Sequence, residues 1–292
     1  MVIVKLTGGL GNQLFQYSAA RAIAHRNNQR LAFDVSYYAE DQSRTYKLSH
    51  FSIYGSLISP HQLAFLTGRG TRGVRKYLSR AARLIVPGLE HRVVEARSFR
   101  FDESIAKSTG NIYMVGFWQS EKYFKDTEGL LRGELALKLP PDKANAAVLE
   151  SIVGANSVSL HVRRGDYVSD PHARRLMGVL PLDYYRRAIE TLGQITREPH
   201  FFVFSDDMAW VRANIQINGP VTYVTHNGVN QDYADLRLMA NCHHHIIANS
   251  SFSWWGAWLC SYPGKTVIAP RTWFSDVRWD ASDLIPESWI SL

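Results

Sequence analysis

The chain has little cysteine and no long apolar run. These two absences exclude a disulfide-rich protein and a protein with membrane-spanning helices. Only Cys242 and Cys260 occur among 292 residues, too few for a disulfide scaffold, so we expect a reducing, cytoplasmic compartment. No run approaches the ~18 consecutive apolar residues of a membrane-spanning helix. The opening segment, MVIVKLTGGL, lacks the charged and apolar regions of a signal peptide and predicts a buried strand. Apolar residues make up 46% and charged residues 20% of the chain, which is typical of a globular protein with a sizeable core.

Positive charge is concentrated in the first half of the chain. Residues 1–150 carry 21 basic and 13 acidic side chains, whereas residues 151–292 carry 12 and 13. The densest stretch, residues 69–83, has no acid, and its pattern is that of an amphipathic helix. Two interpretations stay open: contact with an anionic membrane, on its inner face, and ordinary packing. Nucleic-acid binding is not expected, because no such motif accompanies the charge. The basic side chains of this stretch are Arg69, Arg72, Arg75, Lys76, Arg80 and Arg83.

Strand and helix patterns alternate in two blocks, which predicts an α/β fold with two domains. Pro140 and Pro141 mark a linker, so we expect domains at residues 1–142 and 143–292. Apolar runs without polar alternation indicate parallel strands covered on both faces. The first block predicts strands at 2–6, 31–34 and 112–117, and helices at 12–26 and 120–135. The second predicts strands at 158–162, 201–205, 221–225, 245–248 and 266–269, with helices at 183–195, 207–215, 232–242 and 253–261.

Ligands of doubly wound sheets bind beyond the carboxyl ends of the strands, so the residues that follow each strand are the site candidates. In HVRRGDY, Arg163 and Arg164 follow a predicted strand. Their planar donor groups match phosphate oxygens, although a surface ion pair with nearby carboxylates is the alternative. His161 lies inside the strand, where it either binds a base edge or is an ordinary core residue.

Two further strand ends carry polar residues. Asp206 and Asp207 in FVFSDDMAW fit a helix cap, a metal pair or acceptors for the N–H donors of guanine. In NSSFSWW, hydroxyl groups stand where a strand passes into a helix, which favours an anion, with ordinary capping as the alternative. The polar residues of this second motif are Asn249, Ser250, Ser251 and Ser253. The consecutive Cys242, His243, His244 and His245 do not predict a metal site, because neighbours on a strand point to opposite faces.

A glycine turn follows the first predicted strand. The turn contains Gly8, Gly9 and Gly11. Gly9 and Gly11 partly match a dinucleotide fingerprint, and Asp34 ends the next strand, where a ribose-binding acid would lie. The position of the third fingerprint glycine holds Leu14, so the match is weak. The turn still allows a ligand to approach the backbone closely, with the amides of Asn12 and Gln13 beside it.

Taken together, GGLGNQLFQY, HVRRGDY, FVFSDDMAW and IIANSSFSWWGAWL resemble, in this order, the signature segments of the bacterial-type α-1,2-fucosyltransferases, from residue 5 to about residue 270. The resemblance implies a GT-B-type glycosyltransferase with two Rossmann-like domains facing across a cleft. The C-terminal domain would bind GDP-fucose and the N-terminal domain the acceptor. The implied reaction moves L-fucose from GDP-β-L-fucose, with inversion, to the 2-hydroxyl of a terminal galactose. The acceptor would be an oligosaccharide or a lipid-linked glycan, as in O-antigen synthesis.

The resemblance also implies roles for individual residues. Arg163 and Arg164 would bind the diphosphate, His161 and one of Asp206 and Asp207 the guanine, and the serines the phosphate oxygens. The donor-binding set is His161, Arg163, Arg164, Asp206, Asp207, Asn249, Ser250, Ser251, Ser253, Gly9 and Gly11. Asn12 would lie near the reacting sugar, and Arg163, Asn12 and Asp166 form the catalytic set, with Asp170 as a second candidate base.

Other classes stay open beside this one. Fixed arginine charge can replace a metal at a departing diphosphate, so we expect no metal and no further cofactor. A nicotinamide-dependent oxidoreductase using the turn at Gly8, Gly9 and Gly11 is the alternative enzyme. A non-catalytic lectin would suit the 8 tryptophans and 14 tyrosines, but lectins are mostly all-β.

Overall fold

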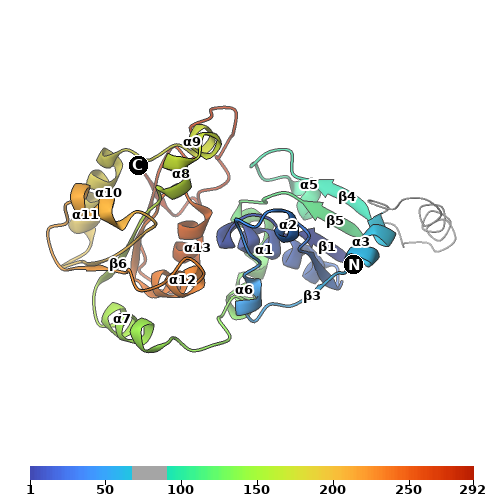
Figure 1. Ribbon diagram of the computed structural model, residues 1–292, viewed down its shortest axis with the longest axis horizontal. Helices are drawn as coiled ribbons and strands as arrows, with labels where there is room; N and C mark the ends of the chain where they lie inside the picture. Colours follow the sequence, from blue (N-terminus) through green and yellow to red (C-terminus); the bar gives the residue numbers. More distant parts are fainter. Residues whose placement is uncertain (68–90) are drawn as a thin grey trace. The chain divides into compact units, whose positions relative to one another are not determined.

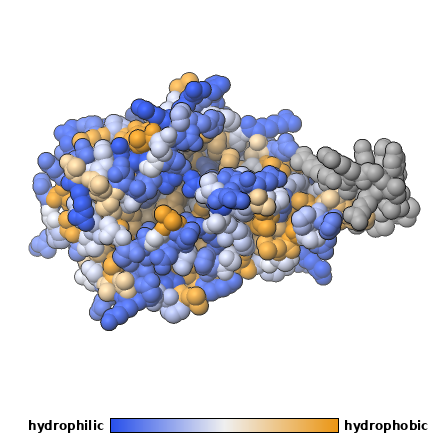
Figure 2. Space-filling view, in the orientation of Figure 1, coloured by the Kyte–Doolittle hydropathy of each residue, from blue (hydrophilic) through white to orange (hydrophobic). Residues whose placement is uncertain are grey.

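A computed structural model of the chain describes residues 1–67 and 91–292. The chain forms two compact units, Met1–Ala136 and Leu137–Leu292, which divide just before Pro140 and Pro141 (Figure 1). The basic stretch at residues 69–83 lies outside the described residues. Within the described part of the chain, no helix combines the length and the apolar character needed to cross a membrane. Figure 2 shows one face of the molecule, mostly hydrophilic with scattered apolar residues.

The first unit is built on a parallel sheet whose strand order is β3-β2-β1-β5-β4. Its strands are β1 (Val2–Lys5), β2 (Leu31–Asp34), β3 (Ser56–Leu57), β4 (Arg92–Glu95) and β5 (Ile112–Val115). Val2 of the central strand pairs with Leu31 on one side and Ile112 on the other. Val2, Ile3 and Val4 are fully buried, as expected of a strand that is covered on both faces.

The helices of the first unit begin with α1, which starts directly after the glycine turn and has a buried stretch from Leu10 to Ala24 broken only at Asn12. The helices are α1 (Leu10–Arg26), α2 (Tyr37–Glu40), α3 (Pro60–Thr67), α5 (Glu103–Ala106) and α6 (Glu128–Glu134). Short 3-10 turns lie at Leu48–His50, Glu121–Tyr123 and Lys125–Thr127. Since β1 lies between β2 and β5, the strand order reverses there, and the loops after β1 and β5 diverge.

The second unit has a six-stranded parallel sheet of order β11-β10-β9-β6-β7-β8. Its strands are β6 (Ser157–Val162), β7 (His200–Ser205), β8 (Val221–Tyr223), β9 (His244–Ile246), β10 (Val267–Ala269) and β11 (Ile290–Ser291). Its helices are α7 (Lys143–Val153), α8 (Gly165–Ser169), α9 (Pro171–Met177), α10 (Leu182–Ile195), α11 (Met208–Asn214), α12 (Asp232–Asn241) and α13 (Ser251–Leu259). One face of the sheet buries Leu160 and Val203, and the other buries Phe202 and Phe204.

One sequence expectation is wrong in detail. The helix expected over 120–135 is α6 preceded by two 3-10 turns, because Phe124 leaves helical geometry (φ −140°) and packs on Phe15 with ring centroids 6.2 Å apart. The linker expected around Pro140 and Pro141 leads at once into α7, which Asp142 caps by accepting the Asn145 N–H at 2.9 Å. The α/β class with two parallel, doubly wound sheets is confirmed.

Candidate functional site

The loops after β6 and β9 lie side by side at the carboxyl edge of the second sheet. The two strands are paired, Leu160 opposite Ile246, yet the chain leaves β6 towards β7 and returns to β9 from the far side. Such a reversal opens a crevice between the two loops. The Tyr167 hydroxyl donates a hydrogen bond to the Asn249 carbonyl oxygen at 3.2 Å, which ties the loops together. The arginine motif and the serine motif, expected to share a site, therefore do meet.

Arg163 is held by two carboxylates at the end of β6. Its guanidinium lies 2.6 Å from Asp166 Oδ1 and 2.9 Å from Asp206 Oδ2, and it stands over the Tyr167 ring at 5.4 Å. Burial opposes its charge, but Asp206 and Asp166 outweigh burial, so the pKa of Arg163 is raised. About a quarter of the side chain (24%) is exposed, so a permanently charged donor group is fixed in place and still open to a ligand.

Arg164 is fixed in a different way. Its Nε donates to Asp207 Oδ2 at 3.0 Å, and its guanidinium stacks on the Trp210 ring at 4.0 Å. The hydrogen bond from Arg164, followed by that from the Trp210 N–H, lowers the pKa of the Asp207 carboxyl. Asp207 also caps α11 through that N–H.

Asp206 contacts three consecutive residues of the arginine motif. It accepts from the Arg163 guanidinium and from the Arg164 backbone N–H at 2.8 Å. A Cβ at Gly165 would lie only 2.4 Å from Asp206 Oδ2. The glycine is therefore required for this close approach, and all four oxygens of Asp206 and Asp207 already accept hydrogen bonds or ion pairs.

The two candidate bases have different surroundings. Asp166 lies in α8 and accepts from Arg163 at 2.6 Å. Asp170 caps α9 by accepting the backbone N–H groups of His172 and Ala173. The contacts of Asp170 are those of a helix cap, whereas Asp166 directly contacts Arg163.

His161 is neutral, and one of its buried ring nitrogens has no hydrogen-bond partner in the described structure. It is 5% exposed, and its ring lies 5.6 Å from that of Phe252 in α13. Burial, followed by the charge of Arg163, lowers the pKa of His161 to about 3. Its Nδ1 has no hydrogen-bond partner among the described residues, so a ligand placed beside it would supply one.

The serine motif divides into residues that anchor the loop and residues at the start of α13. Asn249 is buried and donates to the carbonyl oxygens of Met177 (2.8 Å) and Trp273 (3.1 Å). The hydroxyl of Ser253 donates to the carbonyl oxygens of Ala248 and Ser250, so it serves the loop itself. Ser250 is the N-cap of α13 without a side-chain cap bond in the described structure, and Ser251 opens the helix. Ser250, Ser251 and the first backbone N–H groups are thus placed for an anion.

One half-buried carboxylate of the second unit was missed by sequence reasoning. Burial raises the pKa of Asp235 in α12 to about 6, against the opposing hydrogen bond from Asn227 at 2.7 Å. Asp235 precedes the buried Leu238 and Met239 by one helical turn, so it lies on the sheet-facing side of α12. His161 lies on the same face of the sheet, because it alternates with Leu160 and packs on Phe252. An acid at an apolar-face position of an amphipathic helix is the signal that could have identified it.

The glycine turn belongs to the first unit and occupies the reversal point of that sheet. Gly8 has φ +73°, and Gln119, which follows β5, donates to Asn12 Oδ1 at 2.9 Å. Gln13 donates to the carbonyl oxygens of Gly8 (3.1 Å) and Thr45 (2.9 Å), so it holds the segment after α2 over the turn. Gly9 and Gly11 lie in the same turn, at the start of α1.

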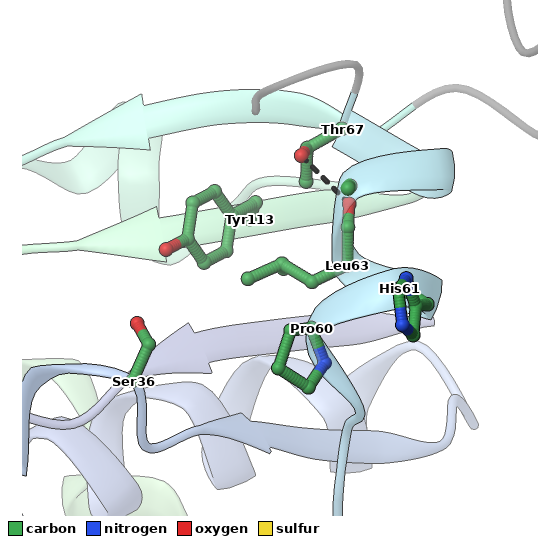
Figure 3. Close-up of a pocket in the computed structure, with 7 residues that line it drawn as sticks. Ser36, Pro60, His61, Leu63, Thr67 and Tyr113 are labelled. Carbon is green, nitrogen blue, oxygen red and sulfur yellow. Dashed lines mark hydrogen bonds between the residues drawn. The ribbon is translucent and has the colours of Figure 1, made fainter. Parts of the chain in front are cut away.

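Asp34 does not have the surroundings of a ribose-binding acid. Its carboxylate is 3% exposed and accepts from the Tyr113 hydroxyl at 2.6 Å and the Ser36 N–H at 2.9 Å. Tyr113 also lines a pocket of about 320 Å³ under α3, where it faces Leu63 (Figure 3). The nicotinamide-dependent oxidoreductase therefore has no support at this position.

The histidine cluster has structural contacts. His245 is fully buried and hydrogen-bonds Ser159 at 2.8 Å, and His243 stacks on Tyr262 at 4.1 Å. Across residues 1–67 and 91–292, no group of three or more His, Cys, Asp or Glu side chains is arranged to hold a metal ion.

Comparison with known proteins gives concordant results. The family model described as glycosyl transferase family 11 matches residues 90–292. The O-antigen biosynthesis glycosyltransferase WbnK of Escherichia coli is 34% identical over 98% of this chain and 99% of its own length. An alpha-1,2-colitosyltransferase of Escherichia coli is 32% identical over 100% of this chain and 99% of its own. Among solved structures, fucosyltransferase NodZ from Bradyrhizobium aligns with a TM-score of 0.51 and 14% identity, over 87% of this chain and 92% of its own, which shows the shared fold.

Proposed function

Because the chain belongs to glycosyl transferase family 11 and is a glycosyltransferase, we propose that it moves L-fucose from GDP-β-L-fucose to the 2-hydroxyl of a terminal β-galactose. The four motif blocks support fucose as the transferred sugar and galactose as the acceptor. The α-1,2 linkage in the name of the colitosyltransferase relative supports the α-1,2 bond, and the O-antigen relative supports a role in surface-glycan synthesis. The unit around residues 143–292 binds the donor, and the unit around residues 1–142 contributes to acceptor binding.

A single observation carries this proposal: a hydrogen bond from Tyr167 to Asn249 ties the loop of the two arginines, at the end of β6, to the segment that enters α13. The bond between fucose C1 and the β-phosphate oxygen breaks as the acceptor oxygen bonds to C1 from the opposite face, so negative charge accumulates on the departing GDP. That negative charge is stabilised by Arg163, Arg164 and the N-terminus of α13. Because Asp166, Asp206 and Asp207 already fix the arginines, little reorganisation accompanies the reaction.

The acceptor proton passes to a carboxylate, for which Asp166 is the proposed base. In an oxocarbenium-like transition state the hydroxyl loses its proton late, so a weak base suffices. The ion pair with Arg163 links Asp166 to the diphosphate site. Asn12, paired with Gln119 in the first unit, is proposed to hold an acceptor hydroxyl.

The guanine is proposed to lie beside His161 and Asp235. Guanine presents adjacent N–H donors on one edge, which an ionised carboxylate accepts. Asp206 and Asp207 hold the arginines, whereas Asp235 is a half-buried acid on the same face as His161. This assigns the base-reading carboxylate to Asp235 in place of Asp206 or Asp207.

The direct test is incubation with GDP-fucose and a panel of galactose-terminated oligosaccharides, with the product linkage determined by NMR. A new α-1,2-fucosyl bond is expected, and exclusive transfer from another nucleotide sugar would overturn the donor assignment. GDP should raise the melting temperature, whereas NAD should not, since only a ligand of the native state stabilises it.

The basic stretch at residues 69–83 is proposed to contact anionic membranes. The double variant Arg75→Glu/Arg80→Glu should lose binding to vesicles that contain anionic lipid, while turnover on a soluble acceptor stays unchanged. Equal vesicle binding by the variant and the parent chain would remove this role.

A further inference from the structure

An exposed aromatic pair lies at the carboxyl edge of the first sheet. Phe99 follows β4 and Phe117 follows β5, and their rings are parallel within 11° with centroids 6.0 Å apart. Phe117 is 38% exposed and Phe99 is partly exposed. A single exposed apolar side chain is ordinary, but two stacked rings form a larger exposed apolar surface, here named the Phe99/Phe117 platform.

The backbone on either side of Phe117 is in an unusual conformation. Gly116 has φ +152° and Trp118 has φ +54°, the left-handed region that bulky residues rarely enter. Trp118 is 2% exposed and packs on Tyr123 at 5.8 Å. A Cβ at Gly116 would lie 2.4 Å from the Cβ of Ala96, so the loops after β4 and β5 are in close contact. The turn thus buries Trp118 and turns Phe117 outward, a local strain of the kind that concentrates at ligand sites.

The loop that carries Phe99 is anchored to Tyr123. Phe101 packs edge-on against Tyr123 at 4.9 Å, and the Asp102 N–H donates to the Tyr123 hydroxyl at 2.9 Å. With Phe101 directed into these contacts, Phe99 is held against Phe117. The loop that carries Phe99 is therefore anchored by contacts with the buried Tyr123.

The platform lies next to the polar pair at the reversal point of the sheet. Gln119, two residues after Phe117, donates to Asn12 Oδ1 at 2.9 Å. The strand order β1-β5-β4 places Phe117 and Phe99 successively farther from Asn12. Adjacent strands are about 4.8 Å apart, so the strand ends that precede Phe117 and Phe99 lie one and two spacings from the end of β1, which leads into the turn with Asn12. This offset is on the order of one sugar ring.

We propose that the Phe99/Phe117 platform binds the apolar face of the second sugar of the acceptor, the residue to which the terminal galactose is attached. This inference rests on the proposed function. A pyranose ring carries C–H groups on one face, and packing that face on flat aromatic rings removes apolar surface from water while the hydroxyls stay solvated. The Asn12–Gln119 pair supplies amide groups for the adjacent galactose.

The test compares a disaccharide and a monosaccharide acceptor. For Phe117→Ala, kcat/KM for galactosyl-β1,3-N-acetylgalactosamine should fall roughly three- to tenfold, the ratio that corresponds to about 0.7–1.4 kcal/mol. The value for methyl β-galactoside should stay within about twofold, because that acceptor does not reach the platform. Phe117→Tyr keeps the ring and should restore the disaccharide value. The matched control is Phe65→Ala, which removes a ring of similar exposure (39%) from α3 of the same unit and should change neither acceptor.

Equal loss on both acceptors, or no loss on the disaccharide, would overturn the platform. If Phe117→Ala fails to fold, Phe99→Ala is the second variant, with folding checked by the melting temperature and by its rise with GDP. Saturation-transfer NMR of the disaccharide with the intact chain separates the two proposals. If the chain transfers fucose to neither acceptor, the proposed function fails; if the chain shows no ring contact with the second sugar, or if Phe117→Ala retains that contact, the platform fails.

Discussion

Asp235→Asn should make the protein more stable and its donor binding weaker. Burial holds the pKa of Asp235 at about 6, against an ordinary value of 3.8, a difference of about two pKa units. At 1.36 kcal/mol per unit, the ionised carboxylate costs at most about 3 kcal/mol of folding free energy at neutral pH. Asparagine is uncharged and keeps an oxygen for the Asn227 amide. The expected rise in melting temperature is up to roughly 6–12 °C, at about 2–4 °C per kcal/mol for a unit of this size.

The pH dependence of that gain has a definite sign. A carboxyl group whose folded-state pKa is raised destabilises the fold fully above pH 6 and not at all below pH 3.8. The stability advantage of Asp235→Asn should therefore be complete at pH 7.5, decline as the pH falls through 6, and vanish near pH 4. Urea unfolding of both proteins across this range measures it.

The same substitution should weaken GDP binding by roughly 10- to 100-fold, because a hydrogen-bonded charge at the guanine edge is lost. Isothermal titration with GDP checks this. Asp142→Asn is the control, since hydrogen bonds from Asn145 lower the pKa of Asp142, and its neutralisation should bring no stabilisation. A lower melting temperature for Asp235→Asn would refute the argument from burial, and unchanged GDP affinity would remove Asp235 from the base site.

The remaining predictions concern the arginine crevice. Arg163→Ala and Arg164→Ala should each lower kcat by about 10²-fold or more with the fold intact by circular dichroism, because each removes a preorganised donor; near-normal turnover would exclude that residue. Gly165→Ala should lose most activity, since its Cβ would collide with Asp206 Oδ2 at 2.4 Å, whereas Gly193→Ala, where a Cβ meets no atom within 4 Å, should be neutral. Tyr167→Phe removes the 3.2 Å bond to Asn249 and should raise the donor KM several-fold, measured by initial rates. Excess EDTA should leave turnover unchanged, and inhibition that magnesium or manganese reverses would establish a metal requirement.

Much of the donor-side architecture follows from the sequence through one rule of parallel sheets. Arg163 and Asn249 are 86 positions apart, yet both follow buried strands, and this alone predicts that they share an edge. The tie through Tyr167 is not predictable, because it depends on the side-chain geometry of a short helix. The resemblance to α-1,2-fucosyltransferases is confirmed at the level of the family, whereas the roles of individual site residues stay predictions.

The elements that sequence patterns missed are short or depend on tertiary contacts. Strands β3 and β11 have two residues each, too few for a periodic signal. Strand β4 reads RVVE, with only Val94 buried. The break at Phe124 and the left-handed Trp118 arise from aromatic packing against partners distant in the chain or buried beneath the turn, and local propensity does not contain that information.

Asp206 holds Arg163 and Arg164 and lies close against Gly165. These contacts have a practical consequence for protein engineering. The arginine loop and the loop that carries Asp206 are about forty positions apart in the chain, yet their conformations depend on each other. A chimera could take the arginine loop from a relative without the loop that carries Asp206. Its arginine would then lack the carboxylate that holds it, or the carboxylate would collide with the residue at position 165. Recombination between family members should therefore succeed when the crossover points fall outside residues 163–207, and fail more often between them.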